Sequence, residues 1–392
     1  MGIPSLVSSC GSYLAKGDRP ARLLTFCVLM VTSVTSSFLA VFFKEDLHFT
    51  ATHIGLLFSI QAVTGVLVAF PAGLSNDRIT SRTLVGASLA AQALCFVLMA
   101  VVKPFLAFAL VFFGWTAANA LFRLSLDVQI LKSTGHGETS RRVNLYQASR
   151  FLGLLLGTLA AGLAIERLDF PLAFLITAGL TFLMLPLVWS LKPTPISAVS
   201  LKDYKADFSD LKVVAFALWI FLFTTHWGAE MTCYGLFLRE DLGLSFTGLG
   251  LYFAGEFLAM VLTFLVMSRT PPTNETLRRL AVWGLFLSGI GHMGQVLRPV
   301  WVSFSFRAVH GVGDAMMFVV FYVGISRLFK LERMGGNTGL MNMTTMVGLV
   351  AGSLVYSLLG ERYGYGLPLW VSGAVTLILI PPLFLRRVRE SL

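Results

Sequence analysis

Three ionisable residues lie in an apolar run of the sequence that is long enough to cross a lipid bilayer. The run extends from Trp301 to Leu328 and contains Arg307, His310 and Asp314. Their i, i+3 and i+7 spacing places all three side chains on one face of a helix. Ionisable groups at membrane depth are costly and normally face a bundle interior or a water-filled cavity, so this face is predicted to line a path for protons, ions or polar solutes. The alternative is a neutralised pair that packs one helix against another.

Further ionisable residues occur in other apolar runs. They are Arg123 and Asp127, Arg150, His226 and Glu230, Glu256, and His292. Arg123 and Asp127 are spaced i, i+4, and so are His226 and Glu230, so part of this charge is predicted to be neutralised within single helices. With neutral histidines, the runs contain three cations and four acids. One acid is therefore free to carry a proton.

The composition is that of an integral membrane protein. The chain has 392 residues, 56% hydrophobic and 13% charged, with a mean hydropathy of +0.78, whereas ordinary soluble domains have about 25% charged residues. Apolar runs of about 20 residues predict an all-α fold of twelve transmembrane helices. They cover residues 21–43, 53–74, 83–102, 105–131, 143–165, 171–191, 212–238, 247–268, 280–297, 300–328, 339–360 and 367–385. The short connections leave no room for a soluble catalytic domain, so we expect no enzyme, cofactor or metal.

The net charge of +10 follows the loops and does not form a nucleic-acid-binding patch. Most of the 30 lysine and arginine residues fall in alternate connections and near the two chain ends. This positive-inside asymmetry predicts a multi-pass protein of a bacterial inner membrane with both termini in the cytoplasm, residues 1–20 forming a cytoplasmic leader. The four cysteines (Cys10, Cys27, Cys95 and Cys233) show no paired spacing, so neither a disulfide nor a metal site is expected.

The sequence repeats itself at a constant offset of 195 residues. Residues 44–47 return as 239–242, and Glu166-Arg167 returns as Glu361-Arg362. An even number of spans per repeat gives two halves of like orientation, related by an axis along the membrane normal, with a solute site at their interface. The predicted parts are an N-terminal six-helix bundle (1–191), a cytoplasmic linker (192–211) and a C-terminal six-helix bundle (212–392).

The loop after the second apolar run contains Gly73, Asp77, Arg78 and Arg82. It resembles the signature of the major facilitator superfamily between its second and third spans, which has a Gly, an Asp four residues later, an adjacent Arg and a further basic residue. Two other signature positions, a Leu and a second Gly, are occupied here by Ser75 and Thr80. The resemblance implies the major facilitator fold, and it implies that this loop gates the conformational change.

The chain also resembles the lactose permease group of oligosaccharide:proton symporters. That group has a basic residue and then a His three positions later in its tenth span, which match Arg307 and His310. Its eighth-span Gly-Glu-Leu-Leu matches the segment around Glu256. Asp127 and Arg150 look like the acid late in the fourth span and the Arg early in the fifth that hold the sugar in that group.

The chain departs from that group at several positions. Gly313 stands where the group has a Glu in the tenth span, and the nearest acid is Asp314. Gly157 and Ala259 replace the group's sugar-stacking Trp and an Asn. The repeat places Gln61 at the position equivalent to Glu256, so an acid there is not a packing requirement of the fold.

These features predict a proton-coupled symporter that works by alternating access. Its expected solute is a small polar organic molecule such as a sugar or glycoside. The expected proton-coupling residues are Glu256, His310, Asp314 and Arg307. The expected solute-binding residues are Asp127, Arg150, Glu256, Glu230 and His292. Five residues are expected to line one central cavity: Asp127, Arg150, Glu256, His310 and Asp314.

Other functions remain open at this stage. A nucleoside:proton symporter of the same superfamily also has acids in the eighth and tenth spans, and a proton-driven exporter of sugars, drugs or other small molecules fits the same pattern. From another class, a membrane sensor or assembly partner that kept the fold needs no titratable residues in a cavity. The expected partners are a small solute and the lipid bilayer, without nucleic acid, and the expected functional unit is a monomer.

Overall fold

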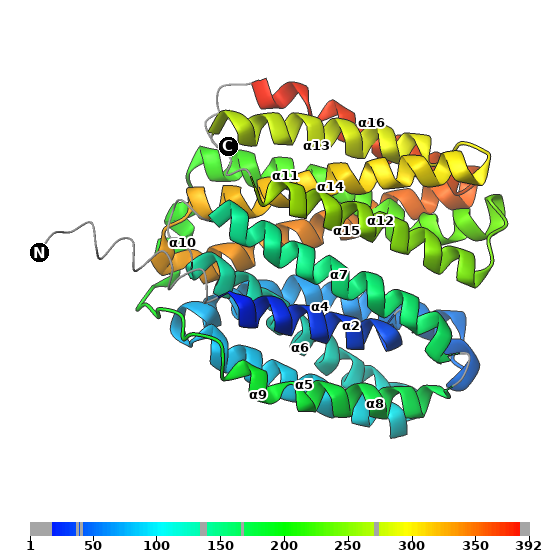
Figure 1. Cartoon of the computed structure of the whole chain (residues 1–392), viewed down its shortest axis with the longest axis horizontal. Helices are drawn as coiled ribbons and strands as arrows, with labels where there is room; N and C mark the ends of the chain where they lie inside the picture. Colours follow the sequence, from blue (N-terminus) through cyan, green and yellow to red (C-terminus); the bar gives the residue numbers. More distant parts are fainter. Residues whose placement is uncertain are drawn as a thin grey trace, which may run out of the picture.

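The protein is described by a computed structural model that covers residues 18–36, 39, 42–133, 139–165, 168–269 and 274–384. Most of the predicted leader, Cys10 and the Glu166-Arg167 pair lie outside these described residues. Within them, every regular element is a helix, so the predicted all-α fold is confirmed (Figure 1).

The helices follow the order of the predicted spans, with one short helix in the linker. The first half contains α2 (Arg19–Ser36), η1 (Phe42–Asp46), α4 (Ala51–Arg78), α5 (Ser81–Val101), α6 (Phe105–Lys132), α7 (Thr139–Ile165), α8 (Phe170–Leu183) and α9 (Leu185–Val188). The linker contains α10 (Leu201–Asp207). The second half contains α11 (Leu211–Ala229), η2 (Glu230–Tyr234), η3 (Phe237–Asp241), α12 (Phe246–Met267), α13 (Asn274–Gly294), α14 (Val300–Leu328), η4 (Leu331–Arg333), α15 (Met334–Tyr363), α16 (Gly366–Ile378) and η5 (Pro381–Phe384).

Among the described residues, nine helical stretches are long and apolar enough to cross a membrane. The other three predicted spans correspond to α2, α7 and α13, which are the least apolar of the long helices. Charge lowers the hydropathy of all three, because α2 contains Arg19 and Arg22, α7 contains three arginines, and α13 contains Arg278 and Arg279. Each of the twelve predicted runs overlaps one helix or two or three consecutive helices.

Side-chain caps fix where several helices begin. Thr50, Thr80 and Ser245 each accept a hydrogen bond from the backbone N–H three residues further on, at the starts of α4, α5 and α12. Such caps satisfy one of the free N–H groups of a first helical turn. Thr80 is one of the two residues that depart from the superfamily signature, and it gains this capping role in place of the signature glycine.

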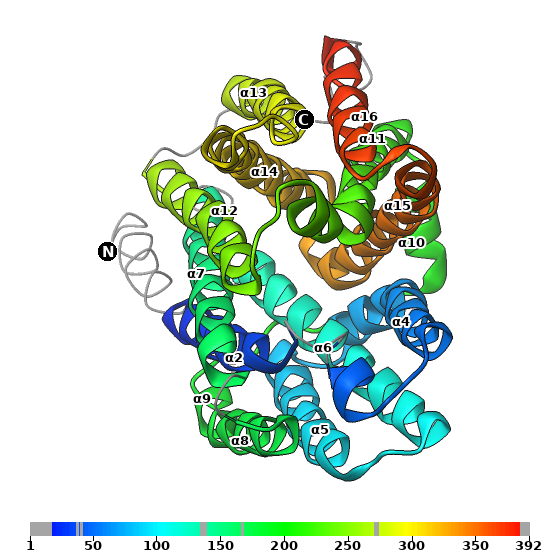
Figure 2. The same ribbon diagram turned by 90° about the vertical axis from the view of Figure 1, so that its right-hand side faces the viewer.

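The helices pack in two groups, α2 to α9 and α11 to α16, which face each other across a central interface (Figures 1 and 2). At that interface α4 packs against α15, and α7 packs against α12. The repeat makes these two pairs equivalent, since Ala51 and Phe246, the first residues of α4 and α12, are 195 positions apart, as are Thr139 and Met334, which begin α7 and α15. The domain boundaries assigned from the sequence stay a prediction.

Glycines allow the closest helix contacts, and they recur at the same offset. Gly153 of α7 lies against the backbone of Phe26 in α2, where an added Cβ would meet the Phe26 carbonyl oxygen at 2.5 Å. Gly348 of α15 lies in the same way against the carbonyl of Phe221 in α11, again at 2.5 Å. A larger residue at either position would force the two helices apart. The tight pairs α2–α7 and α11–α15 therefore support each half in the same manner.

Candidate functional site

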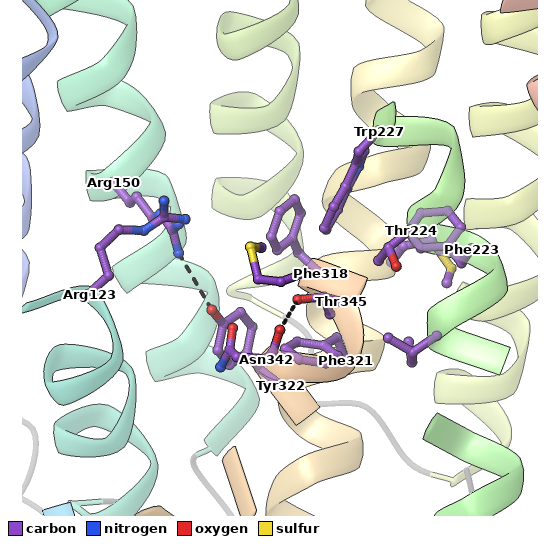
Figure 3. Close-up of a pocket in the computed structure, with 13 residues that line it drawn as sticks. Arg123, Arg150, Phe223, Thr224, Trp227, Phe318, Phe321, Tyr322, Asn342 and Thr345 are labelled. Carbon is purple, nitrogen blue, oxygen red and sulfur yellow. Dashed lines mark hydrogen bonds between the residues drawn. The ribbon is translucent and has the colours of Figure 1, made fainter. Parts of the chain in front are cut away.

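A pocket of about 70 Å³ lies between the two halves (Figure 3). Its walls come from α6 and α7 of the first half and from α11, α14 and α15 of the second. The lining residues are Arg123, Arg150, Ile220, Phe223, Thr224, Trp227, Met317, Phe318, Phe321, Tyr322, Asn342, Thr345 and Met346. The pocket therefore occupies the interface at which the repeat predicts a solute site.

The repeat places this pocket on the axis that relates the two halves. Asp127 and Tyr322 are 195 positions apart, and the Tyr322 hydroxyl donates a 2.8 Å hydrogen bond to the Asp127 carboxylate. A residue that contacts its own repeat equivalent must lie close to that axis. Two further equivalent pairs, Arg150 with Thr345 and Arg123 with Phe318, line the pocket itself. At equivalent positions around the axis, the first half thus contributes two arginines, and the second half contributes Thr345 and Phe318.

The wall from the first half is basic. Arg150 is buried, with Nη1 3.5 Å from the Tyr322 hydroxyl and 3.9 Å from the Asp127 carboxylate. Arg123 is exposed in the pocket and has no hydrogen bond or ion pair with any other residue that the structure describes. Two guanidinium groups therefore face the pocket (Figure 3). The nearby Asp127 carboxylate is buried.

The predicted pair between Arg123 and Asp127 is not formed. Both oxygens of Asp127 accept hydrogen bonds from phenols instead, from Tyr146 at 2.9 Å and from Tyr322 at 2.8 Å. The i, i+4 spacing brought the two residues to neighbouring turns, but Asp127 points into the helix interface and Arg123 points into the pocket. Arg123 thus acts on Asp127 through its charge and not through a direct contact, and it is a candidate solute ligand.

The wall from the second half is aromatic with a few polar groups. The indole of Trp227 stacks on the ring of Phe318, with centroids 5.5 Å apart and planes 21° apart. Asn342 and Thr345 lie beside these rings, and the Thr345 hydroxyl donates to the Asn342 carbonyl oxygen at 2.7 Å. Such a wall offers stacking surface and a small number of hydrogen-bonding groups, which is typical of sites for small organic ligands.

A second group of ionisable residues, all buried except the half-buried Glu230, lies within the second half, and we call it the second-half cluster. It consists of His226, Glu230, Glu256, His292, Arg307, His310 and Asp314. Arg307 forms ion pairs with Glu230 and with Glu256, and its guanidinium lies 4.1 Å from the centre of the Tyr234 ring. One cation thus joins acids from η2 and α12 to α14.

Two histidines lie close to Asp314, the third acid of the cluster. Asp314 accepts hydrogen bonds from the Ser288 hydroxyl at 2.7 Å and from the Trp227 indole at 3.0 Å, and its carboxylate lies 3.3 Å from His226 Nε2. His310 Nε2 lies 3.0 Å from Glu230 and 3.8 Å from Asp314.

His292, predicted to bind solute, lies deeper in the same cluster. It is fully buried, its Nδ1 is 2.9 Å from the Ser372 hydroxyl, and its Nε2 is 3.7 Å from Glu230. The predicted local pair of His226 with Glu230 is replaced, since Glu230 faces Arg307 and His310 and His226 faces Asp314.

Four of the five residues expected to line one central cavity are divided between two compartments, this pocket and the second-half cluster. Of the five residues expected to line it, only Arg150 lines this pocket, while Glu256, His310 and Asp314 lie in the second-half cluster. Trp227 connects the compartments because its ring lines the pocket and its N–H bonds to Asp314. Sequence spacing could not show this connection, since Trp227 and Asp314 lie on different helices.

The signature loop lies at the end of the molecule that carries α10, which we call the linker end. Asp77, fully buried, forms a 2.8 Å ion pair with Lys132 of α6 and accepts hydrogen bonds from the N–H groups of Gly335 and Gly336, at 2.9 and 2.7 Å. These two groups begin α15, so the carboxylate binds at a helix N-terminus, where the helix dipole favours negative charge. Asp77 thus joins the two halves directly.

The linker helix completes this contact. Tyr204 of α10 donates a 2.7 Å hydrogen bond to Asp77, and burial together with that carboxylate raises the pKa of Tyr204 well above its usual value, so the hydroxyl stays a donor at neutral pH. Arg333 forms a bidentate ion pair with Asp207 at 2.6 and 2.7 Å. We call Asp77, Lys132, Tyr204 and their backbone donors the linker-end network.

The other signature residues have different surroundings. Gly73 lies against Gly335 and Gly339, where an added Cβ would meet the Gly339 Cα at 2.9 Å. Arg78 is exposed, with Nη2 3.5 Å from the Val199 carbonyl oxygen. Arg82 lies over the Trp189 ring at 5.5 Å. Gly73 and Asp77 therefore contact the second half, whereas the two arginines contact the linker and the end of the first half.

Comparison with known families decides the membership of the chain. The sequence profile of the Major Facilitator Superfamily matches residues 23–272 and 216–392. The chain belongs to the major facilitator superfamily. The superfamily assignment made from the signature loop is therefore confirmed, and with it a transporter rather than an enzyme.

Solved structures of the superfamily share the fold at low sequence identity. The human organic anion transporter MFSD10 (TETRAN) is 15% identical, with a TM-score of 0.75, and the match covers 93% of this chain and 98% of that one. The proton:xylose symporter XylE bound to 6-bromo-6-deoxy-D-glucose is 13% identical, with a TM-score of 0.76 and coverage of 95% and 96%. The E. coli fucose:proton symporter FucP is 14% identical, with a TM-score of 0.71 and coverage of 93% and 98%. No curated protein sequence matches this chain.

Proposed function

We propose that this major facilitator is a proton-coupled transporter that moves a small organic solute across a bacterial inner membrane by alternating access. The observation that carries the proposal is the on-axis pocket, which one side chain, Trp227, connects to the buried second-half cluster. A pocket on the axis can open to either side when the halves rock against each other. The cluster supplies titratable groups that can link this motion to a proton.

Glu256 is the proposed proton carrier. Its carboxylate pairs with Arg307, and the other ionisable groups that face it are Glu230, His310 and Asp314. A proton on Glu256 removes one of the two acids that hold Arg307, so the guanidinium shifts its contact toward Glu230. Because these groups come from η2, α12 and α14, the shift changes the contacts between three helices. His310 and Asp314 adjoin this step, and Arg307 transmits it.

The linker end is the proposed cytoplasmic side, by the positive-inside asymmetry of the loops. In the structure, the linker-end network joins the two halves at that end. Opening toward the cytoplasm must break the contacts of Asp77 with Gly335 and Gly336, which belong to the other half. We propose that Gly73 and Asp77 gate the cytoplasmic opening in this way.

The pocket favours an organic anion with an aromatic or apolar body. Arg123 and Arg150 bring two positive charges, and the nearby Asp127 cancels only one of them. Guanidinium groups bind carboxylates by charge-assisted hydrogen bonds, while Trp227 and Phe318 supply a stacking surface. The neighbour MFSD10, named as an organic anion transporter, has the same fold.

A neutral sugar is the second candidate. The lactose permease resemblance and the folds of XylE and FucP favour it, and Asn342 and Thr345 offer groups for sugar hydroxyls. In the described conformation, however, Asp127 is buried, accepts hydrogen bonds from two phenols and does not line the pocket, so a sugar in the pocket does not reach it. The free guanidinium of Arg123 therefore ranks the anion first.

The test is uptake into proteoliposomes with an imposed pH gradient. Benzoate and benzamide, which differ mainly in charge, are compared with the neutral sugars fucose and xylose to separate the two solute classes. We expect accumulation of anions, and Arg123→Gln is expected to weaken it about 10- to 100-fold because one charge-assisted contact is lost. Accumulation of sugars alone, unaffected by this substitution, would support the second candidate.

Coupling is tested separately with Glu256→Gln. The amide resembles the protonated acid, so gradient-driven accumulation should be abolished, while solute exchange at equal pH on both sides persists. Glu240→Gln, the same change at an exposed position, is the control. Normal accumulation by the Glu256 variant would show that this acid is structural and that the proposed proton route is wrong.

A further inference from the structure

The second-half cluster brings imidazoles from three helices together. His226 comes from α11, His292 from α13 and His310 from α14, and their ring centres are 4.7 to 5.5 Å apart. The possible ligand atoms of His226, His310 and Asp314 all lie within 4.8 Å of one another, and all three side chains are buried. Ligands at about 2.0 to 2.2 Å from a metal ion are roughly 3 to 4 Å apart. Small side-chain adjustments would therefore close this trio around one ion.

In both His226 and His310, the Nδ1 nitrogen already has a hydrogen-bond partner. Nδ1 of His310 is 2.9 Å from the Ser288 carbonyl oxygen, and Nδ1 of His226 is 2.5 Å from the Phe223 carbonyl oxygen. A carbonyl only accepts, so each Nδ1 must carry the proton. In the neutral rings, Nε2 then presents a lone pair toward the acids. This is the arrangement that orients histidine ligands in metal sites.

The carboxylate of the trio is held in the same way. Its two oxygens accept separately from the Ser288 hydroxyl, at 2.7 Å, and from the Trp227 indole, at 3.0 Å. His226 Nε2 is 3.3 Å and His310 Nε2 is 3.8 Å from the carboxylate of Asp314. A lone pair and a carboxylate at this separation repel unless a cation lies between them. Either a proton or a metal ion can fill that role.

The charge of the cluster suits a divalent cation. With neutral imidazoles, its acids Glu230, Glu256 and Asp314 exceed its one cation, Arg307, by two charges. Arg307 pairs with Glu230 and Glu256, whereas the ionisable groups within 4 Å of Asp314 among the described residues are two histidines. Two imidazoles and one carboxylate are a donor set that first-row transition metals prefer over magnesium or calcium.

We propose that His226, His310 and Asp314 form a binding site for one divalent transition-metal ion, reached from the central pocket past Trp227. The indole lines the pocket and its N–H bonds to one oxygen of Asp314, so this ring lies between the pocket and the three ligands. The proposal assigns this trio a ligand class that the transport function does not require.

The test is titration of the purified full-length protein, carrying no polyhistidine tag, with Co²⁺ in detergent. Visible absorption reports nitrogen and oxygen ligands, and calorimetry gives the stoichiometry. We expect one Co²⁺ per chain, displaced by Zn²⁺. Asp314→Asn and His226→Gln should abolish the absorption, while His48→Gln, at an exposed histidine, should leave it unchanged. No Co²⁺ absorption, or absorption equal in all these variants, would overturn the proposal.

A milder variant keeps the test decisive if a ligand substitution prevents folding. Ser288→Ala removes the hydroxyl that orients Asp314 but leaves all three ligands in place. Loss of such an orienting group typically weakens metal affinity 10- to 100-fold. We expect a Kd increase in that range, with an unchanged elution volume in size-exclusion chromatography. An unchanged Kd in the folded variant would show that Co²⁺ binds elsewhere, which would overturn the proposal.

Discussion

α6 and α14 occupy equivalent places in the two halves but carry opposite chemistry. At the positions equivalent to Arg307 and His310 of α14, the first half has Phe112 and Trp115. These two belong to a buried aromatic group that also contains Phe42, Phe43, Phe96, Phe108 and Phe174, whereas Arg307 and His310 belong to the second-half cluster. The same fold is thus built once around rings and once around charges.

The difference shows that the fold needs volume at these positions, not charge. Burying paired ions is often no more stabilising than packing apolar groups of similar volume. Phe112 reaches its packing with edge contacts to Phe43 at 5.5 Å, and nothing there can titrate. Packing therefore does not explain the charges of the second half, which agrees with the proposal that this half carries the ion coupling.

The largest effect is expected from replacing Arg307, one of the charged residues that distinguish α14 from α6. Arg307→Met leaves Glu230 and Glu256 buried without their shared cation, so the free energy of unfolding should fall by about 3 to 5 kcal/mol. Phe112→Met, an apolar change of similar volume at the equivalent position, should cost about 1.5 kcal/mol or less. Denaturant unfolding in detergent measures both, and adding Glu230→Gln and Glu256→Gln should restore most of the loss. Equal losses in the two single variants would contradict the comparison.

The next effect concerns the linker end, where the halves again differ. The repeat places Pro272 opposite Asp77, so the second half lacks the acid that bonds to a facing helix N-terminus. Asp77→Asn removes the charge from contacts with Lys132 and α15, and each charged hydrogen bond is worth about 1.5 to 3 kcal/mol. Hydrogen exchange in the first turn of α15 should accelerate at least tenfold. Glu332→Gln, an exposed change nearby, should leave that exchange rate unchanged, and equal rates in the two variants would argue against the gate.

Trp227→Phe tests whether Trp227 links the two compartments. Phe keeps the stacking on Phe318 but loses the hydrogen bond to Asp314, which removes about 1.5 kcal/mol. Solute exchange at equal pH should change less than threefold, while gradient-driven accumulation should fall about tenfold. Trp189→Phe, at an exposed tryptophan, is the control. Equal losses in exchange and accumulation would mean that Trp227 acts on the solute alone.

The smallest expected effect is that of Tyr204→Phe. This change removes the linker's hydroxyl from Asp77 and should cost the linker-end network about 1 kcal/mol. Hydrogen exchange in α10 should accelerate about fivefold. In the double variant with Asp77→Asn, the two effects should be less than additive because they share one contact. Full additivity would show that Tyr204 supports α10 without acting through Asp77.

Hydropathy and the internal repeat were sufficient to predict the fold. Each apolar run became a helix, and the 195-residue offset even aligns the π-helical segments η1 and η3. Helices in a bilayer satisfy their own backbone hydrogen bonds, so a span can be recognised without knowledge of its neighbours. The signature loop likewise identified Asp77, because its pattern lies within one short stretch of the sequence.

The candidate site could be predicted only in part, because its contacts join different helices. The i, i+3 and i+7 spacing did put Arg307, His310 and Asp314 in one buried cluster. Spacing along one helix could not reveal that His226 turns toward Asp314, nor that Arg123 faces a pocket instead of its i+4 neighbour. The relative rotation of two packed helices decides both, and that rotation depends on side chains from every neighbour.

The anchoring of α10 through Tyr204 turns the linker into a natural reporter of conformation. Lys202 and Lys205 flank the buried tyrosine and are themselves exposed, so trypsin has two sites on a helix that is held in place. A protease needs an extended, detached segment to cut efficiently, and α10 detaches only when the Asp77 contact breaks. The rate of limited proteolysis in the linker should therefore follow the fraction of molecules open at that end. Solutes and ions that stabilise the conformation closed at that end would then slow the cleavage seen on a gel. They could be recognised in this way without any transport assay.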